Sequence, residues 1–388
     1  MKKYVFLTLA FCLQTIYINA QQAIWGGAPI VSPEINSDNS VSFRLQAPGA
    51  TEVKISGEWM PFKNNAPGFE YMKNQDSVWV YTTGVLPSGL YSYYFTVDGM
   101  RCNDQNNVYQ IRDVATIANI FIIGGGKGDL YSVQNVPHGS VSRRWYTSPT
   151  LNIDRRITIY TPPGYESSDE KYPVLYLLHG MGGDEEAWIA LGRAAQILDN
   201  LIAQGKAKPM IVAMTNGNVD QQAAPGESAL GLYKPIFRLP NTMNGKFEES
   251  FPDVIRFIES NYKVKSNKEN RAIVGLSMGG FHSLHISRYF PETFGYIGLF
   301  SAAIKPFGEV KSTVYDSFDE TLKTQKDNGY KLYWIGMGKT DFLYKPGEEY
   351  RAKLDSLGMK YTYVETEGGH TWANWRHYLS EFVPLLFK

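Results

Sequence analysis

The residues best suited to catalysis lie in the pentapeptide Gly-Leu-Ser-Met-Gly at 275–279. The apolar run at 272–274 predicts a short buried strand, and the segment at 281–289 has the apolar spacing of a helix. A serine on a sharp strand-to-helix turn needs small neighbours, because the strained backbone comes too close for side chains at the flanking positions. Ser277 is therefore a candidate nucleophile, provided that the chain also supplies a base, an acid and an oxyanion hole.

A serine hydroxyl is a poor nucleophile near neutral pH, so it needs an imidazole that accepts its proton. His370 follows the last expected strand through two glycines, in a loop that can present its ring over the carboxyl edge of a sheet. Chain order in this type of hydrolase is nucleophile, acid, base, which favours His370. The remaining histidines are expected on helices, in a connecting segment or at a strand end: His138, His179, His282, His285 and His377.

The orienting acid is expected in the loop after the preceding strand. The apolar run at 332–335 continues through Gly-Met-Gly to Asp341, which is thereby presented at the carboxyl end of that strand. Other aspartates precede this strand or occupy a helix surface, where a solvated charge is the simpler interpretation. Asp341 is therefore the predicted acid.

Two backbone N–H groups must face the charge that develops on an ester oxygen during acyl transfer. The residue after the nucleophile, Met278, is expected to supply one of them. The segment Leu-Leu-His-Gly-Met-Gly-Gly at 177–183 follows a buried strand, and its glycines let the backbone turn back over the sheet, so Met181 is expected to supply the other. His179 in this segment is expected to support the loop or to contact substrate, rather than to carry a proton.

Two domains are expected in a chain of 388 residues. From about 21 to 123, apolar residues alternate with polar ones between turn signals, which predicts a small all-β sandwich. Trp59, Trp79 and Tyr94 there are candidate faces for stacking on sugars, with core packing as the alternative. A glycine-rich stretch at 124–128 opens a linker over 124–135 that is expected to be flexible, since glycine has nothing to pack.

Beyond the linker, residues 136–388 are expected to form an α/β domain. Short apolar runs at 174–178, 210–214, 272–274, 296–300, 332–335 and 361–364 predict strands of a mostly parallel sheet. Helical patterns separate them at 194–203, 253–262, 281–289 and 348–357, and residues 155–160 predict an antiparallel strand at the sheet edge. This alternation predicts a three-layer α/β hydrolase fold with helices on both faces.

The first twenty residues have the pattern of a secretory signal peptide cleaved after Ala20: two lysines, an apolar stretch and a small residue at its end. We therefore expect a secreted or periplasmic protein without a retained membrane anchor. Only Cys102 then remains in the mature chain, so no intramolecular disulfide is expected and the role of this thiol is not indicated. Balanced charge argues against a nucleic-acid partner, and scattered histidines argue against a metal site; no cofactor is expected.

Taken together, four motifs resemble carbohydrate esterase family one, which includes feruloyl and acetyl xylan esterases. They are Tyr-Thr-Pro-Pro-Gly-Tyr at 160–165, Leu-Leu-His-Gly-Met-Gly-Gly at 177–183, Gly-Leu-Ser-Met-Gly-Gly at 275–280 and Gly-Gly-His-Thr-Trp at 368–372. The resemblance implies Ser277, Asp341 and His370 as a catalytic triad. It also suggests Trp372 and Trp375 as walls of the substrate pocket, with packing as the alternative.

Residues 89–106 resemble the closing hairpin of family 48 carbohydrate-binding modules and related early-set immunoglobulin-like domains. The two resemblances together imply a secreted esterase acting on feruloylated or acetylated xylan. The long segment at 216–250 is rich in Gly, Pro and Asn, and we expect it to cover the acyl or sugar site.

Three other functions remain open at this point. A siderophore esterase of the enterochelin type also pairs an N-terminal β domain with this fold, but a cationic pocket would be expected for its anionic substrate. A non-catalytic glycan-binding protein would usually have lost the serine, the acid or the histidine. Acyl transfer differs from hydrolysis only in the exclusion of water, which the sequence does not reveal. Ferulate or acetate preference, the sugar backbone and the oligomeric state are likewise not indicated.

Overall fold

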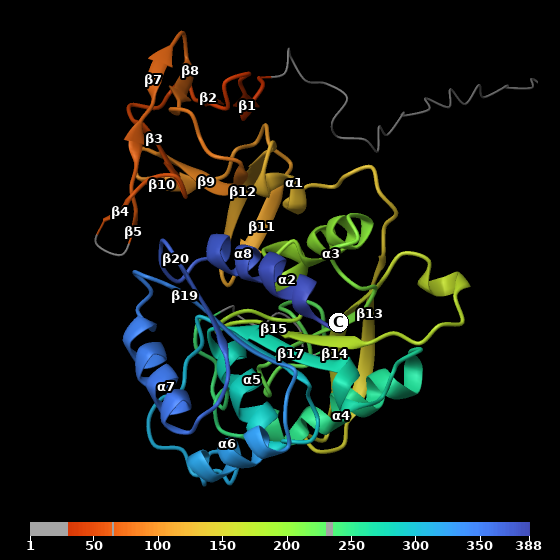
Figure 1. Cartoon of the computed structure of the whole chain (residues 1–388). Coiled ribbons are helices and arrows are strands. Elements are labelled where there is room, and N and C mark those ends of the chain that lie inside the picture. The colour runs from red at the N-terminus through yellow and green to blue at the C-terminus, as the bar shows by residue number, and fades with distance from the viewer. Residues whose placement is uncertain (1–29, 64–65, 230–235) are drawn as a thin grey trace, which may run out of the picture.

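The structure is a computed structural model that describes residues 30–63, 66–229 and 236–388. The predicted signal peptide at 1–20 lies outside the described residues. Two units follow each other along the chain, a strand-rich unit up to residue 123 and an α/β unit from residue 140 onward (Figure 1).

The N-terminal unit consists of two antiparallel sheets that enclose one apolar core. One sheet has the order β1-β2-β8-β7, and the other has the order β11-β12-β9-β3-β6 with β10 paired to β9. A separate short pair joins β4 to β5. The strands are β1 (Glu34–Ile35), β2 (Val41–Gln46), β3 (Val53–Gly57), β4 (Phe62–Lys63), β5 (Ala66–Pro67), β6 (Glu70–Tyr71), β7 (Lys73–Gln75), β8 (Val78–Thr82), β9 (Gly89–Val97), β10 (Met100–Cys102), β11 (Gln110–Asp113) and β12 (Thr116–Ile123).

Two of the three aromatic residues proposed to stack on sugars belong to this core instead. Trp79 is buried, and its indole N–H donates to the carbonyl of Ala47 at 3.0 Å. Trp59 is stacked on Phe43 with ring centroids 5.3 Å apart. Only Tyr94 faces a cavity, which is described below. The sequence alone did not show which faces of these strands point inward.

The C-terminal unit has one sheet of eight strands in the order β13-β14-β16-β15-β17-β18-β19-β20. β13 and β14 run antiparallel to their neighbours, and β15 to β20 pair in parallel. The expected edge strand at 155–160 is antiparallel as predicted, but the edge itself is formed by β13, which the sequence analysis missed. The strands are β13 (Ser140–Ser148), β14 (Ile153–Thr161), β15 (Val174–Leu178), β16 (Ile211–Thr215), β17 (Arg271–Leu276), β18 (Tyr296–Phe300), β19 (Leu332–Gly338) and β20 (Thr362–Thr366).

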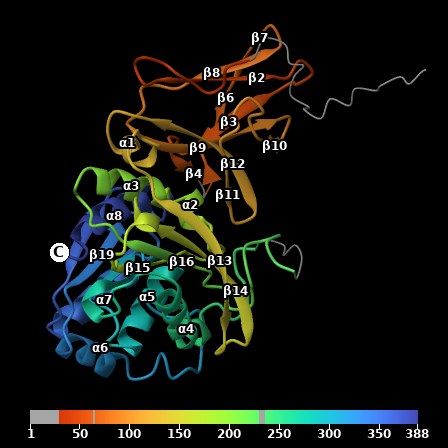
Figure 2. The ribbon, with the colours of Figure 1, turned by 90° about the vertical axis from the view of Figure 1, so that its right-hand side faces the viewer.

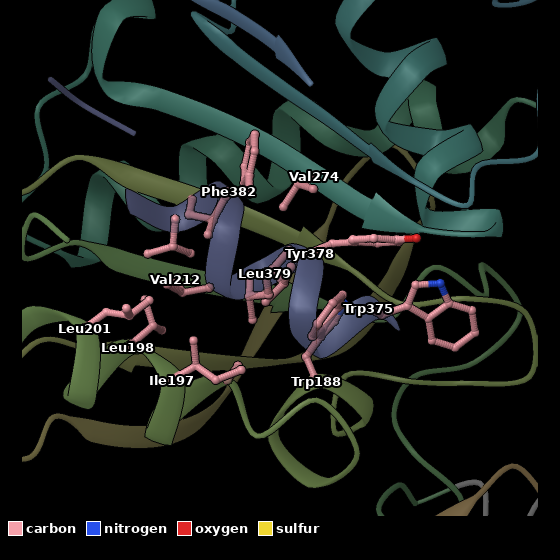
Figure 3. Packing of buried hydrophobic residues seen from close by; sticks show 14 of the residues in the cluster. Trp188, Ile197, Leu198, Leu201, Val212, Val274, Trp375, Tyr378, Leu379 and Phe382 are labelled. Atoms are coloured by element: carbon pink, nitrogen blue, oxygen red, sulfur yellow. The ribbon is translucent and has the colours of Figure 1, made fainter. Parts of the chain in front are cut away.

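Helices cover both faces of this sheet, as expected for an α/β hydrolase fold (Figure 1). Their bounds are α2 (Ala187–Ala190), α3 (Ala194–Ala203), α4 (Lys246–Asn261), α5 (Met278–Tyr289), α6 (Phe318–Asp327), α7 (Tyr344–Ser356) and α8 (Trp372–Phe382). Single-turn 3₁₀ helices occur at Tyr165–Ser167, Lys268–Asn270 and Val383–Leu385. One apolar cluster packs α3 and α8 on the sheet, and a second packs α4, α5 and α7 on the opposite face. Figure 3 shows the first cluster, where α3, α8 and the strand residues Val212 and Val274 contribute labelled side chains.

The glycine-rich connector is ordered and packed, so the expectation of a flexible linker is wrong. Lys127–Tyr131 forms the short helix α1, whose Asp129 carboxylate accepts the N–H groups of Gly125 and Gly126. Gly128 lies so close to Ile123 that an added Cβ would come closer than 3.0 Å to the Ile123 carbonyl oxygen. The glycines thus permit a close approach between backbone segments, and they do not make the connector flexible.

The N-terminal unit is docked on α2, α3 and α8 (Figure 2). Leu90 and Ile120 from its strands belong to the same apolar cluster as α3 and α8. Arg376 on α8 is fully buried and donates to the carbonyl oxygens of Leu191 and Leu90 at 2.9 and 3.3 Å. The two units therefore share part of one core. Among the described helices, none combines the length and apolar character needed to cross a membrane.

We predict that Gly128→Ala destabilises the protein by about 1–3 kcal/mol, because the added methyl overpacks the contact with Ile123. Urea unfolding of the purified variant measures this. Gly49→Ala is the matched control, since an added Cβ there meets nothing within 4 Å, and it is expected to change stability by less than about 0.5 kcal/mol. Equal stability of the two variants would contradict a packed connector.

Candidate active site

Ser277 lies on a strained turn between β17 and α5. Its φ and ψ angles are 52° and −114°, a conformation that is rare for residues other than glycine. Its N–H donates to the carbonyl of Phe300 at 2.8 Å, and its own carbonyl accepts the N–H groups of Phe281 and Ala303. The turn is thus anchored to the end of β18 and to the first turn of α5.

The two glycines that flank Ser277 are required by close backbone contacts. An added Cβ on Gly275 would come closer than 3.0 Å to backbone atoms of Gly279. An added Cβ on Gly279 would come equally close to the carbonyl oxygens of Leu178 and His179. A side chain on Gly279 would therefore push the start of α5 away from the loop after β15, and one on Gly275 would push it away from β17.

The loop after β15 contacts this turn directly. An added Cβ on Gly180 would lie 3.4 Å from the Cβ of Ser277. Two side chains fix the loop, because the Trp188 indole donates to the Leu178 carbonyl at 2.9 Å and the Asn218 amide donates to the Gly183 carbonyl at 2.8 Å. Sequence reasoning missed Trp188 and Asn218, which lie 10 and 35 residues from their acceptors.

His179 supports this loop from inside the protein. Its Nδ1 donates to the carbonyl of Gly180 at 2.7 Å, and its Nε2 accepts the N–H of Gly217 at 2.8 Å. Acceptance at Nε2 requires the neutral ring, and burial lowers the pKa of His179 to about 4. His179 is 2% exposed and does not line the cavity, so the structure places it under the loop and not among the residues that could contact substrate.

His370 and Asp341 form a hydrogen-bonded pair at the ends of β20 and β19. The Nδ1 of His370 lies 3.0 and 2.9 Å from the two carboxylate oxygens of Asp341. Asp341 is buried and also accepts the N–H of Leu343 at 2.9 Å. A carboxylate can only accept here, so Nδ1 carries the proton and Nε2 is left free to accept one.

The loops that carry Asp341 and His370 are joined by their backbones. Thr340 donates to the carbonyl of Gly368 at 3.0 Å, and an added Cβ on Gly338 would come closer than 3.0 Å to the same oxygen. The Asn374 amide donates to the carbonyls of Gly369 and Glu367 at 2.9 and 3.1 Å. Asn374 therefore holds the loop of His370 in place, and sequence reasoning missed it because a lone asparagine carries no motif.

Two further histidines on α5 are buried away from the turn, as the sequence analysis expected. His282 Nδ1 lies 2.7 Å from Glu248 Oε1, and both side chains are fully buried. His285 donates from Nε2 to the Ile304 carbonyl and accepts from Arg288 at Nδ1, and burial lowers its pKa well below the usual range. These contacts hold α5 against its neighbours.

A cavity of about 1150 Å³ lies at the junction of the two units, and Ser277, His370 and Met181 all line it. Met278 is buried at the first position of α5, where free N–H groups point away from the helix. The structure therefore brings Ser277, the His370–Asp341 pair and the loop of Met181 together at one edge of the sheet.

Trp372 and Trp375 also line the cavity, next to His370. The Trp375 ring meets the His370 ring edge to face with centroids 4.9 Å apart, and Trp372 meets Trp375 in the same way at 5.2 Å. Phe342, which is 70% exposed, also contacts the His370 ring, with centroids 4.5 Å apart. Trp375 thus packs on the histidine, Trp372 packs on Trp375, and both form part of the wall.

The described parts of the 216–250 segment border two cavities. Ala224, Pro225, Glu227 and Phe237 line the large one. Residues 238–244 contribute to a second cavity of about 290 Å³, which shares Met181 with the first. The expected loop ends earlier than predicted, because α4 begins at Lys246. Leu230, Leu232, Tyr233 and Lys234 lie outside the described residues.

Among the residues that the structure describes, no three His, Cys, Asp or Glu side chains are grouped as a metal site would require. The charged side chains near the cavity pair with each other instead. Arg156 contacts Glu185, Glu186 and Glu227, and Arg143 contacts Glu186.

Comparisons with known proteins identify an esterase family and esterase relatives. The family model described as "Putative esterase" matches residues 148–386. An endo-1,4-beta-xylanase/feruloyl esterase from Xylanibacter ruminicola is 30% identical over 364 residues, which cover 92% of this chain and 46% of the relative. The chain thus spans about half the length of this relative.

Two solved structures extend the comparison. A CE1 ferulic acid esterase from the anaerobic fungus Anaeromyces mucronatus is 25% identical with a TM-score of 0.55, over 67% of this chain and 95% of the fungal one. The enterobactin esterase of Shigella flexneri is 15% identical with a TM-score of 0.61, over 89% and 92% of the two chains. At that identity the second likeness concerns the fold alone, and it includes the N-terminal unit.

We predict that the His179 ring stays neutral far below pH 6.5. The unfolded chain takes up a proton near pH 6.5 and the folded protein only near pH 4, so stability is lost as pH falls through this window, by up to about 3 kcal/mol. Nuclear magnetic resonance of the ring nitrogens measures the titration, and His179→Gln should remove this part of the pH dependence of unfolding. A midpoint near pH 6.5 in the folded protein would contradict the prediction.

Proposed function

Because the chain belongs to this esterase family, we propose that it hydrolyses feruloyl esters on plant xylan through an acyl-enzyme intermediate. The observation that carries the proposal is the pairing of His370 with Asp341 in the cavity that also holds Ser277 on its strained turn. Ser277 is the nucleophile, His370 the base and Asp341 the orienting acid.

In the first half-reaction, Ser277 Oγ attacks the ester carbonyl carbon while His370 Nε2 accepts its proton. Asp341 holds the ring by its Nδ1 proton and stabilises the imidazolium that forms. The tetrahedral intermediate then collapses, the bond to the alcohol oxygen breaks, and His370 returns the proton to that oxygen. The acyl group remains on Ser277.

The negative charge on the carbonyl oxygen is stabilised by the N–H groups of Met278 and Met181. Met278 begins α5, so the partial positive charge at the start of a twelve-residue helix adds to its own N–H. Water then attacks the acyl-enzyme with His370 as base, which releases the acid and restores Ser277.

The charge of the cavity favours a neutral substrate. Five arginines and five carboxylates line it, and several of them form ion pairs with each other. A ferric siderophore is strongly anionic and needs a surplus of positive charge, which the described lining does not provide. A feruloylated or acetylated xylan carries no such charge. The two-domain likeness to the enterobactin esterase keeps the siderophore esterase as the alternative function.

We further propose that residues 1–20 are a signal peptide and that the mature enzyme is secreted or periplasmic. The N-terminal unit is proposed to be an early-set immunoglobulin-like sandwich related to family 48 carbohydrate-binding modules. Its two antiparallel sheets around one core support this assignment.

We predict that Ser277→Ala lowers turnover of methyl ferulate at least about 10⁴-fold, since the nucleophile is lost. Ferulate release by the purified proteins measures this, and coincident unfolding curves show that the fold is intact. Activity retained in the variant would refute the site. Hydrolysis of p-nitrophenyl acetate but not methyl ferulate by the wild type would keep the triad and move the substrate to acetylated xylan or a siderophore.

We also predict that Asn374→Ala lowers kcat about tenfold or more and leaves KM within about twofold, because the loop of His370 loses its support. Steady-state kinetics on methyl ferulate separate the two constants. Asn261→Ala is the matched control, as it removes an amide that donates to the Phe257 carbonyl on α4, away from the cavity. A rise in KM at constant kcat would show that Asn374 acts on binding instead.

A further inference from the structure

The large cavity is built by both units, although catalysis uses residues of only one. Ser277 and His370 come from the α/β unit, while Glu58, Ser92, Tyr94, Arg101 and Asp113 line the same cavity from the N-terminal unit. The ordered connector and the shared apolar cluster fix the N-terminal unit in this position. One wall of the candidate active site therefore belongs to the β-sandwich.

The chemistry of the reaction determines which part of the substrate lies at this wall. His370 must protonate the leaving alcohol oxygen, so the alcohol half of the ester lies on the side of His370. The residues that follow His370, among them Trp372 and Ala373, line the large cavity but not the small one. The large cavity therefore receives the alcohol half. In the proposed substrate this half is the carbohydrate.

Charged groups on the N-terminal wall are available for hydroxyl groups. Glu58 accepts the N–H of Ser92 at 2.9 Å, and among the described residues neither Glu58 nor Asp113 forms an ion pair. Burial and the neighbouring charge of Glu58 raise the pKa of Asp113. Carboxylates accept strongly from hydroxyl groups, and a sugar presents several of these side by side.

An aromatic face and an unused donor complete the wall. The Arg101 guanidinium lies over the Tyr94 ring, 3.8 Å from its centroid, which holds both planar groups in place. Trp375 lines the same cavity from the α/β unit, and its buried indole Nε1 has no hydrogen-bond partner in the described part of the chain. A buried donor of this kind costs free energy unless a ligand oxygen accepts from it.

We propose that Glu58 and the Tyr94–Arg101 pair form a carbohydrate subsite for the alcohol half of the substrate. This inference rests on the proposed esterase function for the position of the ester, and it names the N-terminal unit as a determinant of specificity. The unit then acts within the active site, on the same sugar chain that carries the scissile ester.

Kinetics on two substrates test the subsite. Glu58→Ala and Tyr94→Ala are expected to lower the ratio of kcat/KM for a feruloylated arabinoxylo-oligosaccharide to that for methyl ferulate about tenfold, since methyl ferulate has no sugar. Glu70→Ala is the matched control, because Glu70 is exposed on β6 and does not line the cavity. An unchanged ratio in both variants, or equal losses on both substrates, would overturn the subsite.

A binding experiment distinguishes failure of the subsite from failure of the proposed reaction. Calorimetric titration of Ser277→Ala protein with unesterified arabinoxylo-oligosaccharide should give a Kd that rises about tenfold when Glu58→Ala is added and stays unchanged with Glu70→Ala. Such binding in a protein whose wild type hydrolyses neither methyl ferulate nor p-nitrophenyl acetate would refute the esterase proposal and keep the subsite. If the wild type releases ferulate but Glu58→Ala leaves the Kd for the oligosaccharide unchanged, the proposed reaction stands and the subsite is refuted.

Discussion

Close backbone packing around Ser277 is the constraint on which the rest of the site depends. Gly275, Gly279 and Gly180 bring the serine turn, the start of α5 and the loop after β15 together without intervening side chains. The N–H of Ser277 also donates to the carbonyl of Phe300 at the end of the neighbouring strand. Since β15, β17 and β18 are adjacent in the sheet, their register sets the position of Ser277 relative to Met181 and Met278, the proposed oxyanion donors.

Three buried arginines bind backbone carbonyls in segments that lie outside the close packing around Ser277. Arg155 donates to the carbonyls of Asn216 and Asn218, Arg288 to those of Val314 and Asp316, and Arg376 to those of Leu191 and Leu90. Burial lowers the pKa of Arg288 to about 10 and also lowers that of Arg376, which reflects the cost of removing each charge from water. A guanidinium offers several fixed donors, so one side chain can order two loop carbonyls at once. Arg155 and Arg288 thus order loops without lining the cavity themselves.

The sequence predicted the strands and helices around the candidate site well because their signals are local. Strand runs at 174–178 and 296–300 and the helix at 194–203 match the structure at both ends, and the family assignment is confirmed. What it could not predict depends on contacts between distant residues. Trp79 is buried because the opposite sheet of the sandwich covers it. His179 is buried under a segment 38 residues away, where the N–H of Gly217 donates to its ring. The glycines at 124–128 have the composition of a flexible linker, yet Asp129 and Ser88 order them by accepting their N–H groups.

The docking of the two units explains why the N-terminal sandwich cannot be treated as a tethered binding module. Leu90 and Ile120 complete an apolar cluster that the α/β unit leaves open, and Arg376 satisfies a carbonyl from each unit. Separation would expose apolar surface and leave a buried guanidinium short of an acceptor, both of which cost free energy. The salt bridge of Arg112 with the buried Asp184 at 2.5 Å adds a polar contact across the junction. A junction of this kind fixes the distance between the two walls of the cavity. A fixed distance is what the N-terminal wall requires if it is to hold a substrate chain opposite Ser277, as proposed.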